Sequence, residues 1–127
     1  MMFKGFAMAL AAFLLSACAT APAPPDVAAP RPFVLERDLL GATTARGEFR
    51  AITGLRRGFT AHLQGTLSGD RFTMVEDFEY DDGERDRKTW VLTRQANGEW
   101  SGVREDVIGT ARGYQDGDVF RLEYDVR

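Results

Sequence analysis

The sequence of 127 residues has a single cysteine, Cys18, and a single histidine, His62. An intramolecular disulfide is therefore excluded, and a metal site built from cysteine or histidine is not expected. The 16 basic and 19 acidic residues give a net charge of −3. This balance argues against a nucleic-acid surface, which needs clustered lysine and arginine. The longest apolar run, from Phe6 to Leu15, has ten residues, and a membrane-spanning helix needs roughly 20.

Signatures of common enzymes are also missing. Ser68 and Ser101 are the only serines after Cys18, and neither lies in a Gly-x-Ser-x-Gly elbow. A single histidine rules out a His-Glu-x-x-His motif, and His62 alternates in phase with polar residues, which predicts a surface position. We therefore expect no enzyme and assign no catalytic residue, metal or cofactor. Paired carboxylates of a glycosidase type are the enzymatic alternative.

The first 17 residues have the pattern of an export signal, with Lys4 ahead of the apolar run. The run ends Leu15-Ser16-Ala17-Cys18, which resembles the lipobox of bacterial lipoproteins. That resemblance implies cleavage between Ala17 and Cys18 and acylation of the Cys18 thiol, whose thiolate is a strong nucleophile. Several acyl chains give stable membrane attachment. Because residue 19 is alanine, the sorting rule of enteric lipoproteins predicts the outer membrane, with the domain facing the periplasm.

All five prolines lie between residues 22 and 32. Proline-rich sequence is extended and semi-rigid, so residues 18–32 are expected to form a tether behind the lipidated cysteine. The remaining residues, 33–127, are enough for one domain with a modest core.

Alternation of apolar and polar residues dominates after residue 33, and no long stretch has a helical period. Asp82-Gly83 and Asn97-Gly98 are strong hairpin signals, the second typical of a type I′ turn. Residues 34–41 are expected to form a helical turn or a loop. About seven strands are predicted, over residues 46–53, 59–67, 72–80, 89–93, 100–104, 107–112 and 120–126.

Short turns between successive strands predict an all-β antiparallel meander. A meander of this length is expected to curl into a barrel or half-barrel, so that its apolar faces meet.

Several segments carry a family resemblance: GEFRAITGLRRGFTAHLQG, EDFEYDDGERDRKTW, NGEWSG, REDVIGTARG and RLEYDV. With the lipobox, they resemble the bacterial lipoprotein family catalogued as domain of unknown function 3833. The resemblance implies an envelope lipoprotein with a lipocalin-like β-barrel and no established activity. Members of that family continue past the position of Arg127 with further strands. The resemblance therefore also implies a domain that is incomplete at its C-terminus, with an exposed edge strand.

An acidic run occupies residues 76–86, which hold seven of the 19 acidic residues. The spacing fails the EF-hand pattern, because the glycine comes one position late and the twelfth residue is Lys88. We expect a solvated hairpin rim balanced by nearby basic residues. A looser divalent-cation site is the alternative.

Glu76 is in phase with the apolar residues Phe72, Phe78 and Tyr80, so its carboxyl group is expected to point inward. A buried carboxylate needs a partner, and Arg94 on the next strand is the predicted one. The pair forms either an internal salt bridge or the polar floor of a ligand cavity; a bulge turning Glu76 outward is a further alternative. The inward aromatic residues likewise either fill the core or line an apolar calyx. The candidate ligand-binding residues are Phe72, Glu76, Phe78, Trp90, Arg94 and Trp100.

The sequence therefore favours a lipid-anchored, non-enzymatic β-barrel that binds a small apolar or amphipathic molecule. The alternative is a structural or assembly partner of an envelope protein, docking through the hairpin at 76–88 or through an edge strand.

Overall fold

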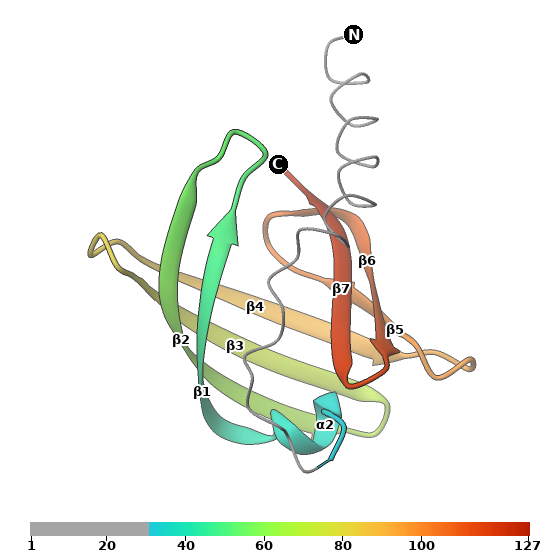
Figure 1. The fold of residues 1–127 in the computed structure, drawn as a ribbon. Helices are drawn as coiled ribbons and strands as arrows, with labels where there is room; N and C mark the ends of the chain where they lie inside the picture. The colour runs from blue at the N-terminus through green and yellow to red at the C-terminus, as the bar shows by residue number, and fades with distance from the viewer. Residues whose placement is uncertain (1–30) are drawn as a thin grey trace, which may run out of the picture. The chain divides into compact units, whose positions relative to one another are not determined.

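The computed structural model describes residues 31–127, and its strands form one antiparallel sheet (Figure 1). Among the described residues, a one-turn helix, α2 (Leu35–Asp38), precedes the sheet, as expected for residues 34–41. The strands are β1 (Gly41–Arg50), β2 (Arg56–Ser68), β3 (Arg71–Tyr80), β4 (Arg85–Arg94), β5 (Trp100–Val103), β6 (Val107–Asp116) and β7 (Val119–Val126).

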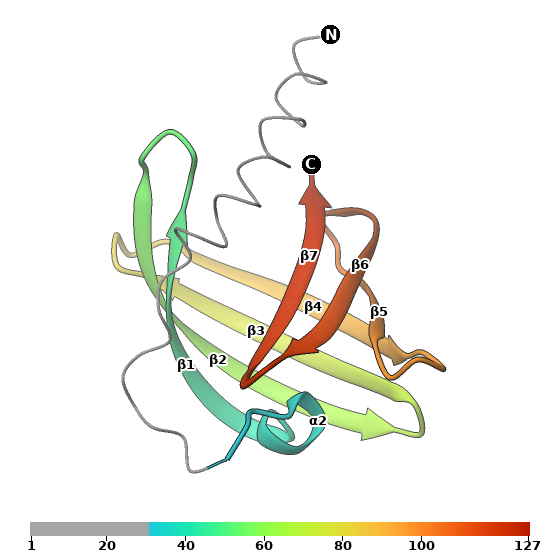
Figure 2. The ribbon, with the colours of Figure 1, turned by 45° about the vertical axis from the view of Figure 1, so that its right-hand side comes forward.

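The strands follow one another across the sheet in the order β1-β2-β3-β4-β5-β6-β7. This order confirms the predicted meander. The sheet curls into a half-barrel, with β1 and β7 as its two edges (Figures 1 and 2).

The chain divides into two compact units. Of the first, the structure describes Arg50–Arg56, the tip between β1 and β2. Within this tip the Ala51 N–H donates to the Leu55 carbonyl at 2.9 Å, and Gly54 has a φ of 91°. The second unit, Ala29–Phe49 with Arg57–Arg127, holds the core and the site described below.

The predicted type I′ turn at Asn97-Gly98 is wrong. A type I′ turn needs positive φ at both central residues, whereas no described residue other than glycine has positive φ. The Gly98 N–H donates to the Gln95 carbonyl at 3.0 Å, and Gly98 has a φ of 83°. This is the three-residue hairpin loop, a type I turn closed by a left-handed glycine. The loop before Glu84 has the same form, with Gly83 at a φ of 89°.

Strand β4 begins four residues before the predicted segment 89–93, because its charged first half pairs with the acidic run of β3. The register sets Glu76 opposite Lys88 and Asp77 opposite Arg87. The Arg87 Nε donates to the Asp77 carboxylate at 2.6 Å. Cross-strand charge pairs of this kind support a strand that has little apolar character.

The core lies inside the curl, and α2 packs against one end of it. Within the described part of the chain, ten hydrophobic residues are buried: Leu35, Ala61, Leu63, Phe72, Met74, Trp90, Leu92, Trp100, Val107 and Ala111. Next to α2 the backbone at Leu39 passes close to Gly65 of β2, where an added Cβ would clash with the Leu39 carbonyl oxygen. Only glycine allows the backbone before β1 to lie this close to β2.

Among residues 31–127, the structure contains no helix with the length and apolar character to span a membrane.

Candidate ligand-binding cavity

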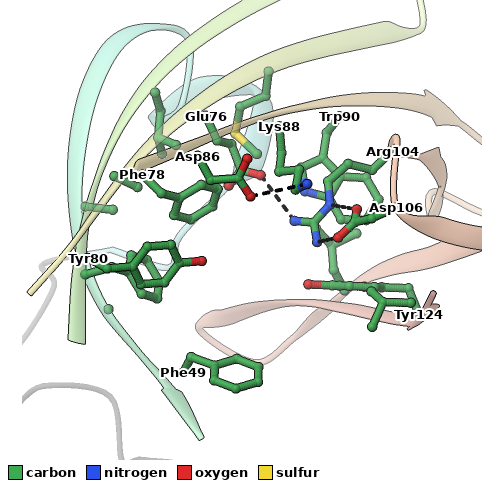
Figure 3. A pocket seen from close by; sticks show the side chains of 18 of the residues that line it. Phe49, Glu76, Phe78, Tyr80, Asp86, Lys88, Trp90, Arg104, Asp106 and Tyr124 are labelled. Atoms are coloured by element: carbon green, nitrogen blue, oxygen red, sulfur yellow. Dashed lines mark hydrogen bonds and ion pairs between the residues drawn. The ribbon is translucent and has the colours of Figure 1, made fainter. Parts of the chain in front are cut away.

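A cavity of about 650 Å³ opens inside the half-barrel, toward the end away from α2 (Figure 3). This volume lies within the range of small-molecule sites, roughly 300–1,000 Å³. Its walls come from β1 to β4, from the turn after β5, and from β7. Six aromatic side chains line it: Phe49, Phe59, Phe78, Tyr80, Trp90 and Tyr124.

The apolar wall is a cluster of rings on β2 and β3. Register places Phe59 opposite Tyr80 and Ala61 opposite Phe78. The rings of Phe59 and Phe78 meet edge to face with centroids 5.2 Å apart, and those of Phe78 and Tyr80 stack at 6.0 Å. Such pairs hold one another in place and leave apolar faces toward the cavity.

At the mouth, Phe49 of β1 is 50% exposed, and Tyr124 and Val126 of β7 are 41% and 52% exposed. Exposed apolar residues grouped around an opening are typical of a surface that a ligand covers.

Charged side chains form a second wall beside the ring cluster, on β3, β4 and the turn after β5, with Arg104 at their centre (Figure 3). Its Nε and Nη2 donate to the two carboxylate oxygens of Asp106 at 2.7 and 3.0 Å. Its guanidinium lies 4.9 Å from the Trp90 ring and 5.1 Å from the Tyr124 ring. The Arg104 side chain is only 11% exposed. A guanidinium that contacts two rings and is bonded twice to a carboxylate is fixed in orientation.

The turn that carries Arg104 is fixed by its neighbour Glu105. Strand β5 is short and pairs with β4 only from Val91 to Arg94. The backbone N–H of Thr89 therefore has no strand partner on that side, and it donates instead to the Glu105 carboxylate at 2.7 Å. This bond ties the turn after β5 to β4 and positions Arg104 over Trp90.

Glu76 points into the cavity from β3, and its side chain is 13% exposed. Its Oε1 lies 3.6 Å from Arg104 Nη1, too far for a hydrogen bond. This buried oxygen has no hydrogen-bond partner among the described residues. Burial raises the pKa of Glu76 to about 7, and the nearby charge of Arg104 opposes that rise without overcoming it.

The predicted partner of Glu76 was wrong, because Arg94 lies at the other end of the barrel. Arg94 Nη2 contacts the Glu36 carboxylate at 2.5 Å, and its guanidinium lies 4.5 Å from the Trp100 ring. The residue opposite Glu76 in register is Lys88, six positions before Arg94. The inward orientation of Glu76 is confirmed, and the nearest cation, Arg104, comes from the turn after β5 and is bonded to Asp106 instead.

The other candidate residues divide between cavity and core. Phe78 and Trp90 line the cavity with Glu76. Phe72 is completely buried and meets Trp100 edge to face at 6.5 Å, near α2. Trp100 and Arg94 also border a smaller cleft of about 210 Å³ beside α2. The aromatic residues near α2 therefore fill the core, whereas those toward the other end of the half-barrel line an open cavity. Each of the two interpretations is right for one end of the half-barrel. Ala17 and Cys18 lie outside the described residues.

Sequence reasoning missed Arg104 and Asp106. They flank a short turn in an ordinary pattern of charges, and nothing local indicates that the turn folds over Trp90. The prediction for His62 is confirmed: its side chain is 53% exposed and lies 3.8 Å from Glu79 on the outer face.

Most of the acidic run forms the charge-balanced hairpin rim that was expected, whereas Glu76 and Asp86 line the cavity. Each of its seven acidic side chains lies within 4 Å of a basic group. Within residues 31–127, no group of three or more His, Cys, Asp or Glu side chains is placed to hold a metal ion.

Fold and site together define an open antiparallel β half-barrel with an aromatic cavity and one charged wall. The family model described as "Protein of unknown function (DUF3833)" matches residues 12–127, and the chain belongs to that family. No significant match was found among curated proteins or among solved structures. The family resemblance is therefore confirmed, and the lipid anchor stays a prediction from sequence.

Proposed function

We propose that this half-barrel binds a small amphipathic molecule in its cavity and that it is not an enzyme. In this proposal the acylated Cys18 anchors the protein to the outer membrane, and the domain faces the periplasm. The sequence of residues 15–18 supports the anchor, and the cavity supports the binding.

The observation that carries the proposal is the division of the cavity into an aromatic wall and a charged wall. Small-molecule sites are mostly apolar, with a few polar groups that set the orientation of the ligand. The rings on β2 and β3 offer apolar area, whose burial contributes about 25 cal/mol per Å². Glu76 and Arg104 provide the polar contacts beside these rings. An amphipathic molecule matches both walls.

The test is binding of Nile red, an uncharged apolar dye that fluoresces strongly in apolar sites. Leu122 lines the cavity and is half-buried, so Leu122→Trp should fill part of the space and weaken dye binding by about tenfold. Leu67→Trp is the matched control, because Leu67 is 41% exposed and does not line the cavity. Thermal unfolding followed by circular dichroism verifies that both variants fold. Equal dye affinity in both variants would contradict binding in this cavity.

The alternative function, docking of an envelope protein through the hairpin at 76–88, receives less support. Its acidic side chains are already paired with basic groups of the same domain. The edge strands β1 and β7 are the other surfaces through which such a partner could add a strand.

A further inference from the structure

The charged wall of the cavity contains more carboxylates than cations. Glu76, Asp86 and Asp106 face Lys88 and Arg104. Lys88 Nζ lies 3.2 Å from the Asp86 carboxylate, and Arg104 binds Asp106 through two hydrogen bonds. Arg46, which lines the cavity from β1, is likewise bonded twice to Asp81, at 2.9 Å each. Every basic side chain that lines the cavity therefore already has a carboxylate partner, and with Glu76 ionised the wall has an excess negative charge.

The acceptor that lacks a partner is Glu76 Oε1. It is buried, and its nearest cation is 3.6 Å away. Buried acceptors are almost always hydrogen-bonded, and an unmade bond is unfavourable. The terminal torsion of a glutamate side chain is soft, so the carboxylate can turn toward a donor that enters the cavity. A ligand with an O–H or N–H group would complete this site.

A cationic ligand fits less well, although the cavity is aromatic. Arg104 already lies over Trp90 and Tyr124, and Arg57 lies 3.8 Å from the Tyr80 ring. Three of the six rings therefore face a guanidinium of the protein. A further cation would therefore have only Glu76 as its counter-charge, and the cost of desolvating an ammonium group can exceed that attraction.

We infer that the cavity selects amphiphiles whose polar group is an uncharged hydrogen-bond donor, a hydroxyl or an amide, over fatty acids and over alkylamines. This inference rests on the proposed function, because it specifies the ligand of the same cavity. Glu76 accepts the donor, and its charge disfavours an acid.

The experiment measures displacement of Nile red from the full-length protein at pH 8.5, with the protein kept in solution by an amphipathic polymer. The probes are octan-1-ol, heptyl methyl ether, octanoate and octylamine. The ether has the same atoms as the alcohol but no donor. We expect octanol to bind about tenfold more tightly than the ether, because a hydrogen bond to a charged group is among the stronger ones. Octanoate and octylamine should each bind at least tenfold more weakly than octanol.

Two variants test whether the preference for octanol over octanoate depends on Glu76. Glu76→Gln removes the negative charge and keeps the shape, so the difference between octanol and octanoate should fall to threefold or less. Glu79→Gln is the matched control, because Glu79 is on the same strand but on the outer face beside Arg85, and it should preserve the full difference.

The two proposals fail in different ways. If Nile red binds and all four probes displace it equally, the donor preference is wrong while the cavity still binds ligands. If octanoate or octylamine binds as tightly as octanol, the charge argument is wrong. A failure of Nile red to bind would remove the proposed function and this inference together.

Discussion

Replacing Glu76 by glutamine tests the electrostatics of the charged wall through the stability of the protein. In the folded protein burial raises the pKa of this carboxyl group to about 7, from an ordinary value of 4.5. The folded state therefore binds the proton more tightly than the unfolded state does. Linkage then requires that the contribution of Glu76 to the free energy of unfolding falls as the pH rises from about 4.5 to about 7, and that this contribution is constant above and below that window.

The difference between the ordinary pKa of 4.5 and the folded-state pKa of about 7 sets the size of the change in stability. One pKa unit corresponds to 1.36 kcal/mol, so ionisation of Glu76 lowers the stability by about 3 kcal/mol across the window. The side chain is only 13% exposed, so solvent screening reduces this value little. Glu76→Gln has no carboxyl group to ionise. The difference in stability between variant and wild type should therefore change by about 3 kcal/mol in favour of the variant between pH 4.5 and pH 8.

Urea unfolding at several pH values measures this difference, with the fluorescence of Trp90 and Trp100 as the signal. Glu79→Gln is again the control, because its carboxyl group lies on the outer face. A stability difference between Glu76→Gln and the wild type that does not vary with pH would refute the reasoning. It would mean that Glu76 is solvated or fully paired in the folded protein.

Two further predictions concern the anchor and the close contact beside α2. Cys18→Ser should abolish labelling of the protein by radioactive palmitate and release it from the membrane fraction, and persistent labelling would contradict acylation at Cys18. Gly65→Ala should destabilise the fold by about 2–3 kcal/mol, because the new methyl group would meet the Leu39 carbonyl and the Phe72 ring. Thr66→Ala is the control, because the neighbouring position is exposed. This variant should change the free energy of unfolding by less than about 0.5 kcal/mol.

Period-two alternation was enough to predict which face of each strand turns inward. The inward position of Glu76 between Phe72 and Phe78 follows from it directly, because a shift of one residue would reverse every side chain. Alternation does not fix how far along the barrel two inward residues lie. Arg94 shares a face with Trp90 and Leu92, yet it is six positions from the residue opposite Glu76. The position of the hairpin turn sets that distance: a two-residue loop at Asp82-Gly83 would place Glu76 opposite Thr89, and the observed loop places it opposite Lys88, so Arg94 is remote in either register.

The positions of the hairpin loops could be predicted from the sequence, but their lengths could not. Glycine at positions 83 and 98 correctly predicted hairpins, because a left-handed residue is needed in each. Both loops contain three residues rather than two, and a dipeptide motif does not distinguish these lengths. The role of Arg104 was even less accessible, because its contacts with Trp90 and Tyr124 depend on the curl of the sheet. Whether aromatic residues fill a core or line a cavity depends on the same curvature, which no single strand encodes.

Native mass spectrometry of the protein purified from its own host cells tests most directly whether the cavity holds a small amphipathic molecule. We predict a bound adduct with the mass of an uncharged hydroxyl- or amide-bearing amphiphile, and we predict that Leu122→Trp loses it while Leu67→Trp retains it. A protein that carries no small molecule, in the wild type as in both variants, would contradict a ligand-binding role for the half-barrel.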